Sequence, residues 1–201
     1  FVLHELVKPG VFELFYGAMK SGKARSLINR VEQLLYFEDI HFIVVQPEVN
    51  TREESLKSRF SSVSLPTVRI DADCPKAILD HISEDTVLVA IDEVQVFTPG
   101  IVRVIEILQR KDINVVAAGL SLDFRGEAFG CMAQLMPLVD EPVALAGVCE
   151  FPGCNKPATR TQRLVNGAPA KRADPTLVIE GSEDTITYEA RCLSCFEIDP
   201  K

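Results

Sequence analysis

The chain has 201 residues, of which 47% are hydrophobic and 25% are charged, so it can form one moderate globular domain and a small second one. Its formal net charge of −8 argues against a general affinity for nucleic acid or anionic membranes, because such binding depends on a basic surface. No apolar run approaches the ~20 residues of a membrane span, and the first ten residues are too short and too charged for a signal peptide. We therefore expect a soluble, cytoplasmic protein.

Hydrophobic periodicity predicts strands and helices in alternation along the first 120 residues. Apolar runs predict strands at 11–17, 41–47, 67–70, 86–93 and 113–120, and helical spacing predicts helices at 24–39, 75–83 and 100–111. Residues 48–62 are polar and poorly periodic. Strands that alternate with helices in this way pair in parallel, so we expect an α/β fold with helices on both faces of the sheet. We assign this domain to residues 1–143 and a small C-terminal domain to residues 144–201.

The sequence GAMKSGKA, at residues 17–24, lies between a predicted strand and a predicted helix. In a GxxxxGK loop at such a place, backbone N–H groups and the helix N-terminus hold phosphate oxygens, and the lysine reaches the outer phosphates. Gly17, Gly22 and Lys23 fit this pattern, which predicts a P-loop that binds ATP. Ala24 stands where a hydroxyl normally helps to hold Mg²⁺. The alternative is a glycine-bearing turn that precedes a lysine by chance.

Two acids, Asp92 and Glu93, end the predicted strand at 86–93. An acid at the end of a strand can reach Mg²⁺ directly or through water, as we expect for Asp92. Glu93 is placed to accept a proton from a hydroxyl nucleophile. The alternative is a pair of solvated acids at the end of a strand.

Four cysteines fall into two close pairs, Cys149 with Cys154 and Cys192 with Cys195. In a reducing compartment, this spacing favours a tetrahedral Zn²⁺ site over disulfides. Four protein ligands leave no open position on the metal, so the predicted zinc is structural. The two other cysteines, Cys74 and Cys131, are predicted to pack as small apolar residues.

Five motifs in order, GAMKSGKA, IDEVQVF, AAGLSLDFRGEAFG, ATRTQRLVNG and YEARCLSC, resemble those of the cellular-type (type II) thymidine kinases. The resemblance covers about residues 11–195. It implies a P-loop α/β domain, a small zinc-ribbon-like domain, and a loop of that domain that closes over the nucleoside. It also implies transfer of the γ-phosphoryl group of ATP to the 5′-hydroxyl of thymidine or deoxyuridine, in a homotetramer that binds neither nucleic acid nor membrane.

The same resemblance assigns roles to individual residues. It implies a catalytic base at Glu93 and a nucleotide and metal segment that contains Asp92 and Gln95. The implied ATP site also includes Gly17, Ala18, Met19, Lys20, Ser21, Gly22, Lys23, Ala24, Asn50 and Arg52. The implied thymine pocket contains Met19, Leu120, Phe124 and Tyr188. The closing loop contributes Thr161, Val178, Ile179, Glu180 and Gly181, and Arg163 is placed near phosphate.

Four departures from the family pattern touch the expected site. Ala24 replaces the metal-binding hydroxyl, Asn50 replaces an acid, Val96 replaces an aromatic residue, and the closing loop is longer than the usual Gly-Gly turn. We expect an active but impaired kinase. Two alternatives are a catalytically silent nucleotide-binding homologue and a zinc-containing P-loop ATPase that acts on nucleic acid.

Overall fold

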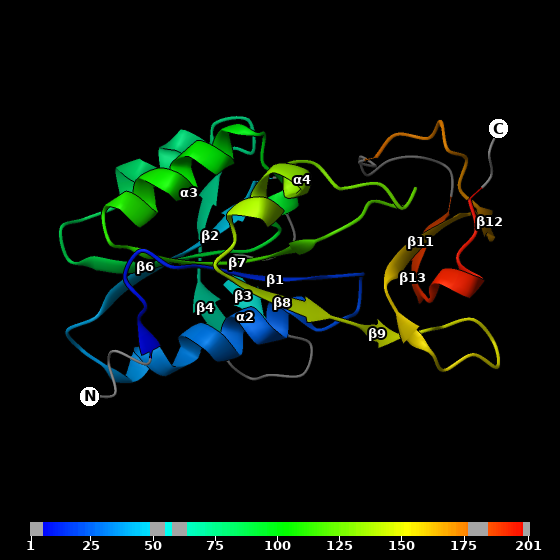
Figure 1. The fold of residues 1–201 in the computed structure, drawn as a ribbon, viewed down its shortest axis with the longest axis horizontal. Helices are drawn as coiled ribbons and strands as arrows, with labels where there is room; N and C mark the ends of the chain where they lie inside the picture. The colour runs from blue at the N-terminus through cyan, green and yellow to red at the C-terminus, as the bar shows by residue number, and fades with distance from the viewer. Residues whose placement is uncertain (1–5, 49–54, 58–63, 177–184, 199–201) are drawn as a thin grey trace.

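A six-stranded parallel sheet is the centre of the fold in the computed structural model, which describes residues 6–48, 55–57, 64–176 and 185–198 (Figure 1). The strand order is β5-β2-β6-β7-β1-β8, and each neighbouring pair is parallel. The strands are β1 (Phe12–Gly17), β2 (His41–Pro47), β5 (Val68–Ile70), β6 (Thr86–Ile91), β7 (Asn114–Leu120) and β8 (Glu141–Leu145). The predicted parallel α/β sheet is therefore confirmed.

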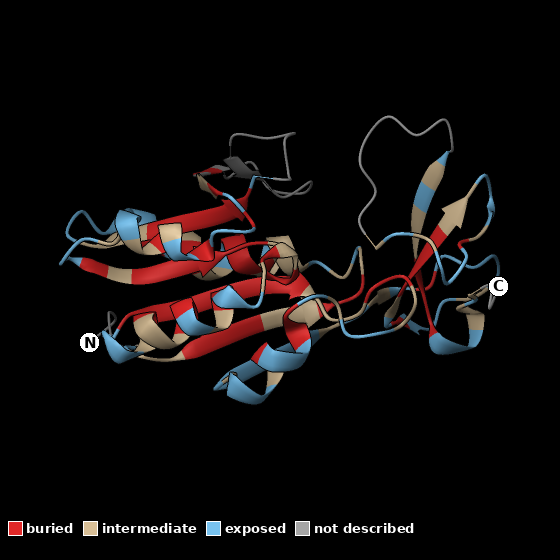
Figure 2. Ribbon diagram, turned by 90° about the horizontal axis from the view of Figure 1, so that it is seen from above, coloured by how far each residue is buried: buried red, intermediate tan, exposed pale blue. Residues whose placement is uncertain are grey.

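Helices cover both faces of this sheet. One face carries α2 (Lys23–Val31) and the 3₁₀ helix η1 (Glu32–Tyr36), and the other carries α3 (Gly100–Arg110) and α4 (Met132–Leu135) (Figure 1). In β6, Val89 and Ile91 pack into the core on the α3 side, whereas Leu88 and Ala90 pack into the core on the α2 side. The four inner strands, β2, β6, β7 and β1, are largely buried (Figure 2), which explains why they appear in the sequence as continuous apolar runs. The edge strand β8 is mostly exposed and was not predicted as a strand.

Two predicted helices differ from the structure, and one hairpin was missed. The predicted helix at 24–39 is α-helical only as far as Val31 and continues as η1, where Leu34 is buried but Tyr36 is exposed. The helix predicted at 75–83 is the 3₁₀ helix η2 (Pro75–His81), and two further 3₁₀ helices are η3 (Val94–Val96) and η4 (Met136–Leu138). The polar segment contributes to a hairpin of β3 (Ser55–Lys57) and β4 (Ser64–Pro66), whose three-residue strands are too short to show an alternating pattern.

The C-terminal part of the chain is built from short antiparallel strands. These are β9 (Gly147–Val148), β10 (Pro157–Ala158), β11 (Arg160–Val165), β12 (Ala168–Pro169) and β13 (Ile186–Arg191), followed by the 3₁₀ helix η5 (Leu193–Cys195). Strand β10 pairs with β9, and β11 lies between β12 and β13. The domain boundary predicted after residue 143 falls inside β8, and the division into two domains stays a prediction. None of the helices in the described part of the chain is long and apolar enough to cross a membrane.

Candidate functional site

The phosphate loop connects the end of β1 to the start of α2. Gly17 ends β1 beside β8, where an added Cβ atom would lie 2.1 Å from the carbonyl oxygen of Leu145. Gly22 precedes α2 at a φ of 88°, and no side chain caps the helix within the described residues. The helix therefore keeps backbone N–H groups that can hold an anion, as the sequence pattern predicts.

Contacts with the C-terminal part hold the tip of this loop. The Met19 N–H donates to Thr161 Oγ1 at 3.0 Å. Lys20, at a φ of 60°, forms an ion pair with Glu150 in which Nζ and Oε1 are 2.7 Å apart. The Glu150 side chain also accepts a hydrogen bond from the backbone N–H of Ala190 at 2.6 Å. The loop is thus fixed by residues about 130 to 140 positions later in the sequence.

Lys23 and the two acids form the charged centre of the site. Burial lowers the pKa of Lys23, while the charges of Glu93 and Asp92 act in the opposite direction. Its Nζ donates to the Ala18 carbonyl oxygen at 2.8 Å. Burial, and then the charge of Glu93, raise the pKa of Asp92 to about 7, although Gln46 Nε2 donates to Asp92 Oδ2 at 3.2 Å. A buried and a half-buried acid beside a phosphate loop suit a divalent cation, because the cation would relieve their repulsion.

Glu93 adopts a backbone conformation that side-chain-bearing residues rarely take. Its φ is 50° and its ψ is 41°, in the left-handed region, two residues after the end of β6 and directly before η3. Such conformations cost of order 1–3 kcal/mol and cluster at functional sites. The turn brings the half-buried Glu93 into the wall of the pocket described next.

A pocket of about 220 Å³ lies between the end of the sheet and the C-terminal strands. Glu93, Gln95 and Val96 line one part of it. The structure also brings six of the expected substrate residues to its wall, namely Met19, Leu120, Phe124, Thr161, Arg163 and Tyr188. The remaining lining residues, which sequence analysis missed, are Leu122, Asp123, Phe129 and Thr176.

Arg163 is bonded to the aromatic wall of this pocket. It is only 3% exposed, and its guanidinium carbon lies 3.9 Å from the centroid of the Phe124 ring. Its Nε donates to the Tyr188 hydroxyl at 3.1 Å, and its two terminal nitrogens donate to the carbonyl oxygens of Pro175 and Thr176. These contacts are to uncharged acceptors and rings on the pocket wall, and the placement of Arg163 near phosphate stays a prediction.

Some expected site residues lie outside the described residues, namely Asn50, Arg52, Val178, Ile179, Glu180 and Gly181. The sequence pattern gave no role to two buried polar residues, Gln46 and Asp123. Gln46 contacts Asp92 from the end of β2, and Asp123 Oδ1 accepts hydrogen bonds from the backbone N–H groups of Arg125 and Glu127. The signal for Gln46 was a polar residue directly after the apolar residues 42–45 of the predicted strand.

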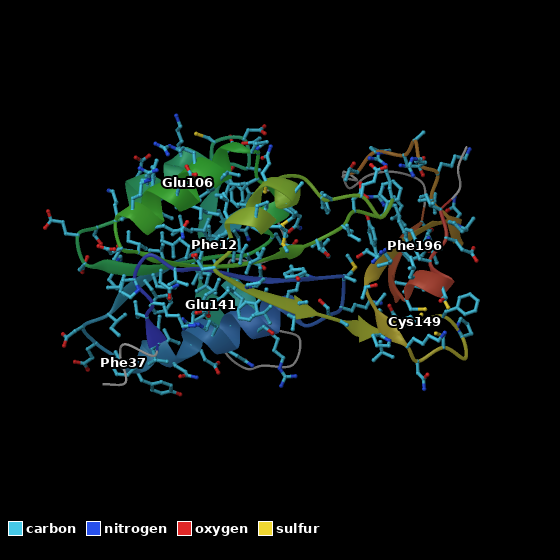
Figure 3. All side chains as sticks on the ribbon, in the orientation of Figure 1. Phe12, Phe37, Glu106, Glu141, Cys149 and Phe196 are labelled. Atoms are coloured by element: carbon cyan, nitrogen blue, oxygen red, sulfur yellow. The ribbon has the colours of Figure 1, made fainter. Side chains whose placement is uncertain are left out.

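The four paired cysteines meet in one cluster beside η5 (Figure 3). The sulfur atoms of Cys149, Cys154, Cys192 and Cys195 all lie within 4.8 Å of one another, and those of Cys154 and Cys192 are 3.8 Å apart. A disulfide would bring two sulfurs to about 2.05 Å, whereas four sulfurs at about 2.3 Å from a tetrahedral zinc lie about 3.8 Å apart. The cluster therefore fits Zn²⁺.

The other two cysteines behave differently from each other. Cys131 is fully buried and its thiol donates to the Val94 carbonyl oxygen at 3.3 Å, which confirms the prediction of a packed residue. The same prediction was wrong for Cys74, which is exposed. Cys74 closes a turn after β5, where its N–H donates to the Asp71 carbonyl oxygen and its side chain faces solvent.

Comparison with known protein families agrees with these features. The family model described as thymidine kinase matches residues 10–196. The match includes the phosphate loop, the acid pair, the pocket and the cysteine cluster. This chain therefore belongs to the thymidine kinase family.

Proposed function

We propose that this protein transfers the γ-phosphoryl group of ATP to the 5′-hydroxyl of thymidine or deoxyuridine. The observation that carries the proposal is the position of Glu93, which lines the same pocket as Phe124 and Tyr188 while its charge acts on the phosphate-loop lysine, Lys23. A nucleoside in the pocket would thus lie beside both a proton acceptor and the phosphate loop. Family membership supports the same reaction class.

The pocket residues suit a flat pyrimidine base. Phe124, Phe129 and Tyr188 offer aromatic faces and edges, and Met19 and Leu120 add apolar contacts. These side chains can orient the nucleoside so that its 5′-hydroxyl points towards Glu93. Orientation of this kind is the larger part of catalysis in phosphoryl transfer, because the reaction needs little covalent help from the protein.

Glu93 acts in this proposal as the base that accepts the 5′-hydroxyl proton. Lys23 and the N–H groups at the start of α2 hold the phosphates of ATP. Asp92 would hold Mg²⁺, directly or through water, and the bound ion would neutralise charge on the transferred group. Ala24 offers no hydroxyl to the metal, so a water molecule would take that position and turnover would be slower.

The cysteine cluster would hold a structural zinc ion. All four ligands come from the protein, so the site leaves no open position for catalysis. We also propose, from the family resemblance alone, a cytoplasmic homotetramer.

Thymidine-dependent release of ADP tests the proposed reaction, with deoxyuridine compared as a second acceptor. Glu93→Gln should retain ATP binding and lower turnover by roughly 10²–10⁴, because it keeps the shape of the side chain and removes the base. Glu106→Gln changes a half-buried glutamate on α3 that pairs with Arg103 and does not line the pocket, and it is the matched control, which should keep wild-type turnover. Nearly normal turnover in Glu93→Gln would remove Glu93 from the mechanism.

A silent nucleotide-binding homologue is the second candidate, favoured by Ala24 in place of the metal-binding hydroxyl. It predicts that calorimetry detects binding of ATP and thymidine while no ADP is released above the thymidine-free rate. Turnover that depends on thymidine would exclude this candidate.

A further inference from the structure

Gln95 is a buried amide whose two ends are both used. It is 2% exposed, its Nε2 donates to Glu93 Oε2, and its Oε1 accepts from the backbone N–H of Leu120 at 3.0 Å. A backbone N–H can only donate, so the amide oxygen must face Leu120 and the amide nitrogen must face Glu93. The hydrogen-bond network therefore fixes the orientation of the amide.

The backbone around Gln95 leaves space for this arrangement. A Cβ atom at Gly119 would lie 2.7 Å from Gln95 Oε1, and a Cβ atom at Gly130 would lie 2.1 Å from the Gln95 carbonyl oxygen. Gly130 also has a φ of 52°, which disfavours any other residue there. Two separate segments, the end of β7 and the turn before α4, thus both carry glycine where they meet Gln95.

We infer that Gln95 is the positioning residue that holds the Glu93 carboxylate in the orientation for proton transfer. This inference rests on the proposed function, in which Glu93 is the base. The amide fixes one carboxylate oxygen of Glu93 and is itself fixed to β7, whose last residue, Leu120, lines the nucleoside pocket. The base and the pocket wall are therefore joined through one side chain, which sets the position of the proton acceptor relative to the nucleoside.

This role differs from the expectation that Gln95 serves ATP and metal binding. Glu93 and Leu120 bond the two ends of the amide, so protein groups and not a nucleotide set its orientation. Removing the amide should therefore affect the chemical step more than the binding of either substrate. The hydrogen bond to a charged group is worth about 1.5–3 kcal/mol, which corresponds to a loss of roughly ten- to hundredfold in rate.

The test is a double-mutant cycle with Gln95→Met and Glu93→Gln, measured by ADP release at saturating ATP and thymidine. Gln95→Met should lower kcat by roughly ten- to hundredfold and leave the KM of each substrate within about threefold. In the Glu93→Gln background the same change should have almost no further effect, because the base that Gln95 positions is already gone. Gln109→Met is the control, since it removes an amide that bridges two acceptors far from the pocket.

Thermal unfolding shows whether Gln95→Met is folded. A second variant keeps the test valid if it is not. Gln95→Asn keeps a neutral amide but is one methylene shorter, so it cannot reach both Glu93 Oε2 and the backbone N–H of Leu120. It should fold and still lose kcat. A kcat within about twofold of wild type in the folded variants, or an equal further loss in the Glu93→Gln background, would overturn the inference. A normal rate in Glu93→Gln alone would instead refute the proposed base.

Discussion

Replacement of Asp92 by asparagine tests the electrostatics of the acid pair in the protein without substrates. Burial and the charge of Glu93 raise the pKa of the Asp92 carboxyl group from its ordinary value of 3.8 to about 7 in the folded protein. Between these two values the folded state binds a proton that the unfolded state has released. The carboxyl group therefore lowers the free energy of unfolding as the pH rises from about 4 to about 7, and asparagine, which cannot ionise, removes this loss.

The size of the effect follows from the same pKa difference. One pKa unit corresponds to about 1.4 kcal/mol, and integration of the proton difference from about pH 5 to about pH 8 gives roughly 2–3 kcal/mol. In urea unfolding at a fixed zinc concentration, we measure the free energy of unfolding of Asp92→Asn minus that of wild type. We expect this difference to increase by roughly 2–3 kcal/mol between about pH 5 and about pH 8.

Asp80→Asn, at an exposed position, is the control. It should change the free energy of unfolding by less than about 0.5 kcal/mol at about pH 5 and at about pH 8. An Asp92→Asn difference from wild type that is the same at both pH values would refute the reasoning.

Three further predictions concern the metal sites and the pocket. Ala24→Ser should raise the rate of thymidine phosphorylation about tenfold and lower the Mg²⁺ concentration required, and an unchanged Mg²⁺ dependence in the kinetic assay would show that water already serves the position. Metal analysis should find about one zinc per chain, and its removal should increase hydrogen exchange in β11 and β13 before the parallel sheet, whereas native protein with metal-free thiols would contradict the zinc site. Arg163→Lys should raise the KM of thymidine about tenfold and leave that of ATP unchanged, because an ammonium group cannot both stack on Phe124 and bond two carbonyls. Arg160→Lys, in the same strand, is the control, and equal KM values in both variants would count against this role.

The inner strands of the parallel sheet were predicted well because they are buried on both faces, whereas the mostly exposed edge strand β8 was not predicted. The run from His41 to Pro47 matches β2 at both ends, since two covered faces require a continuous apolar segment. The helix that follows the phosphate loop was predicted too long, because Leu34 and Leu35 both fit a helical pattern, although only Leu34 is buried. The periodic pattern shows which residues are apolar but not which of them a neighbouring element covers, so it does not predict where the α-helix ends.

The chemistry of the site was only partly accessible from the sequence. The loop with Lys23 and the cysteine pairs could be found because their ligand atoms lie close together in the chain. The contact between the Met19 N–H and Thr161 Oγ1 spans 142 positions, and the stacking of Arg163 on Phe124 also joins distant segments. Such contacts depend on how the sheet and the C-terminal strands pack, so no local spacing indicates them.

The position of β1 inside the sheet has a consequence for synthesis of the protein on the ribosome. Phe12 pairs with Val115, and Glu13 pairs with Glu141, so β1 leaves the ribosome before both of the strands that pair with it. Until residue 145 has left the ribosome, one edge of β1 stays unpaired, and an unpaired edge is a site for pairing with other chains. A nascent chain that stalls before β8 would therefore expose an apolar strand and lack the frame that shapes its phosphate loop.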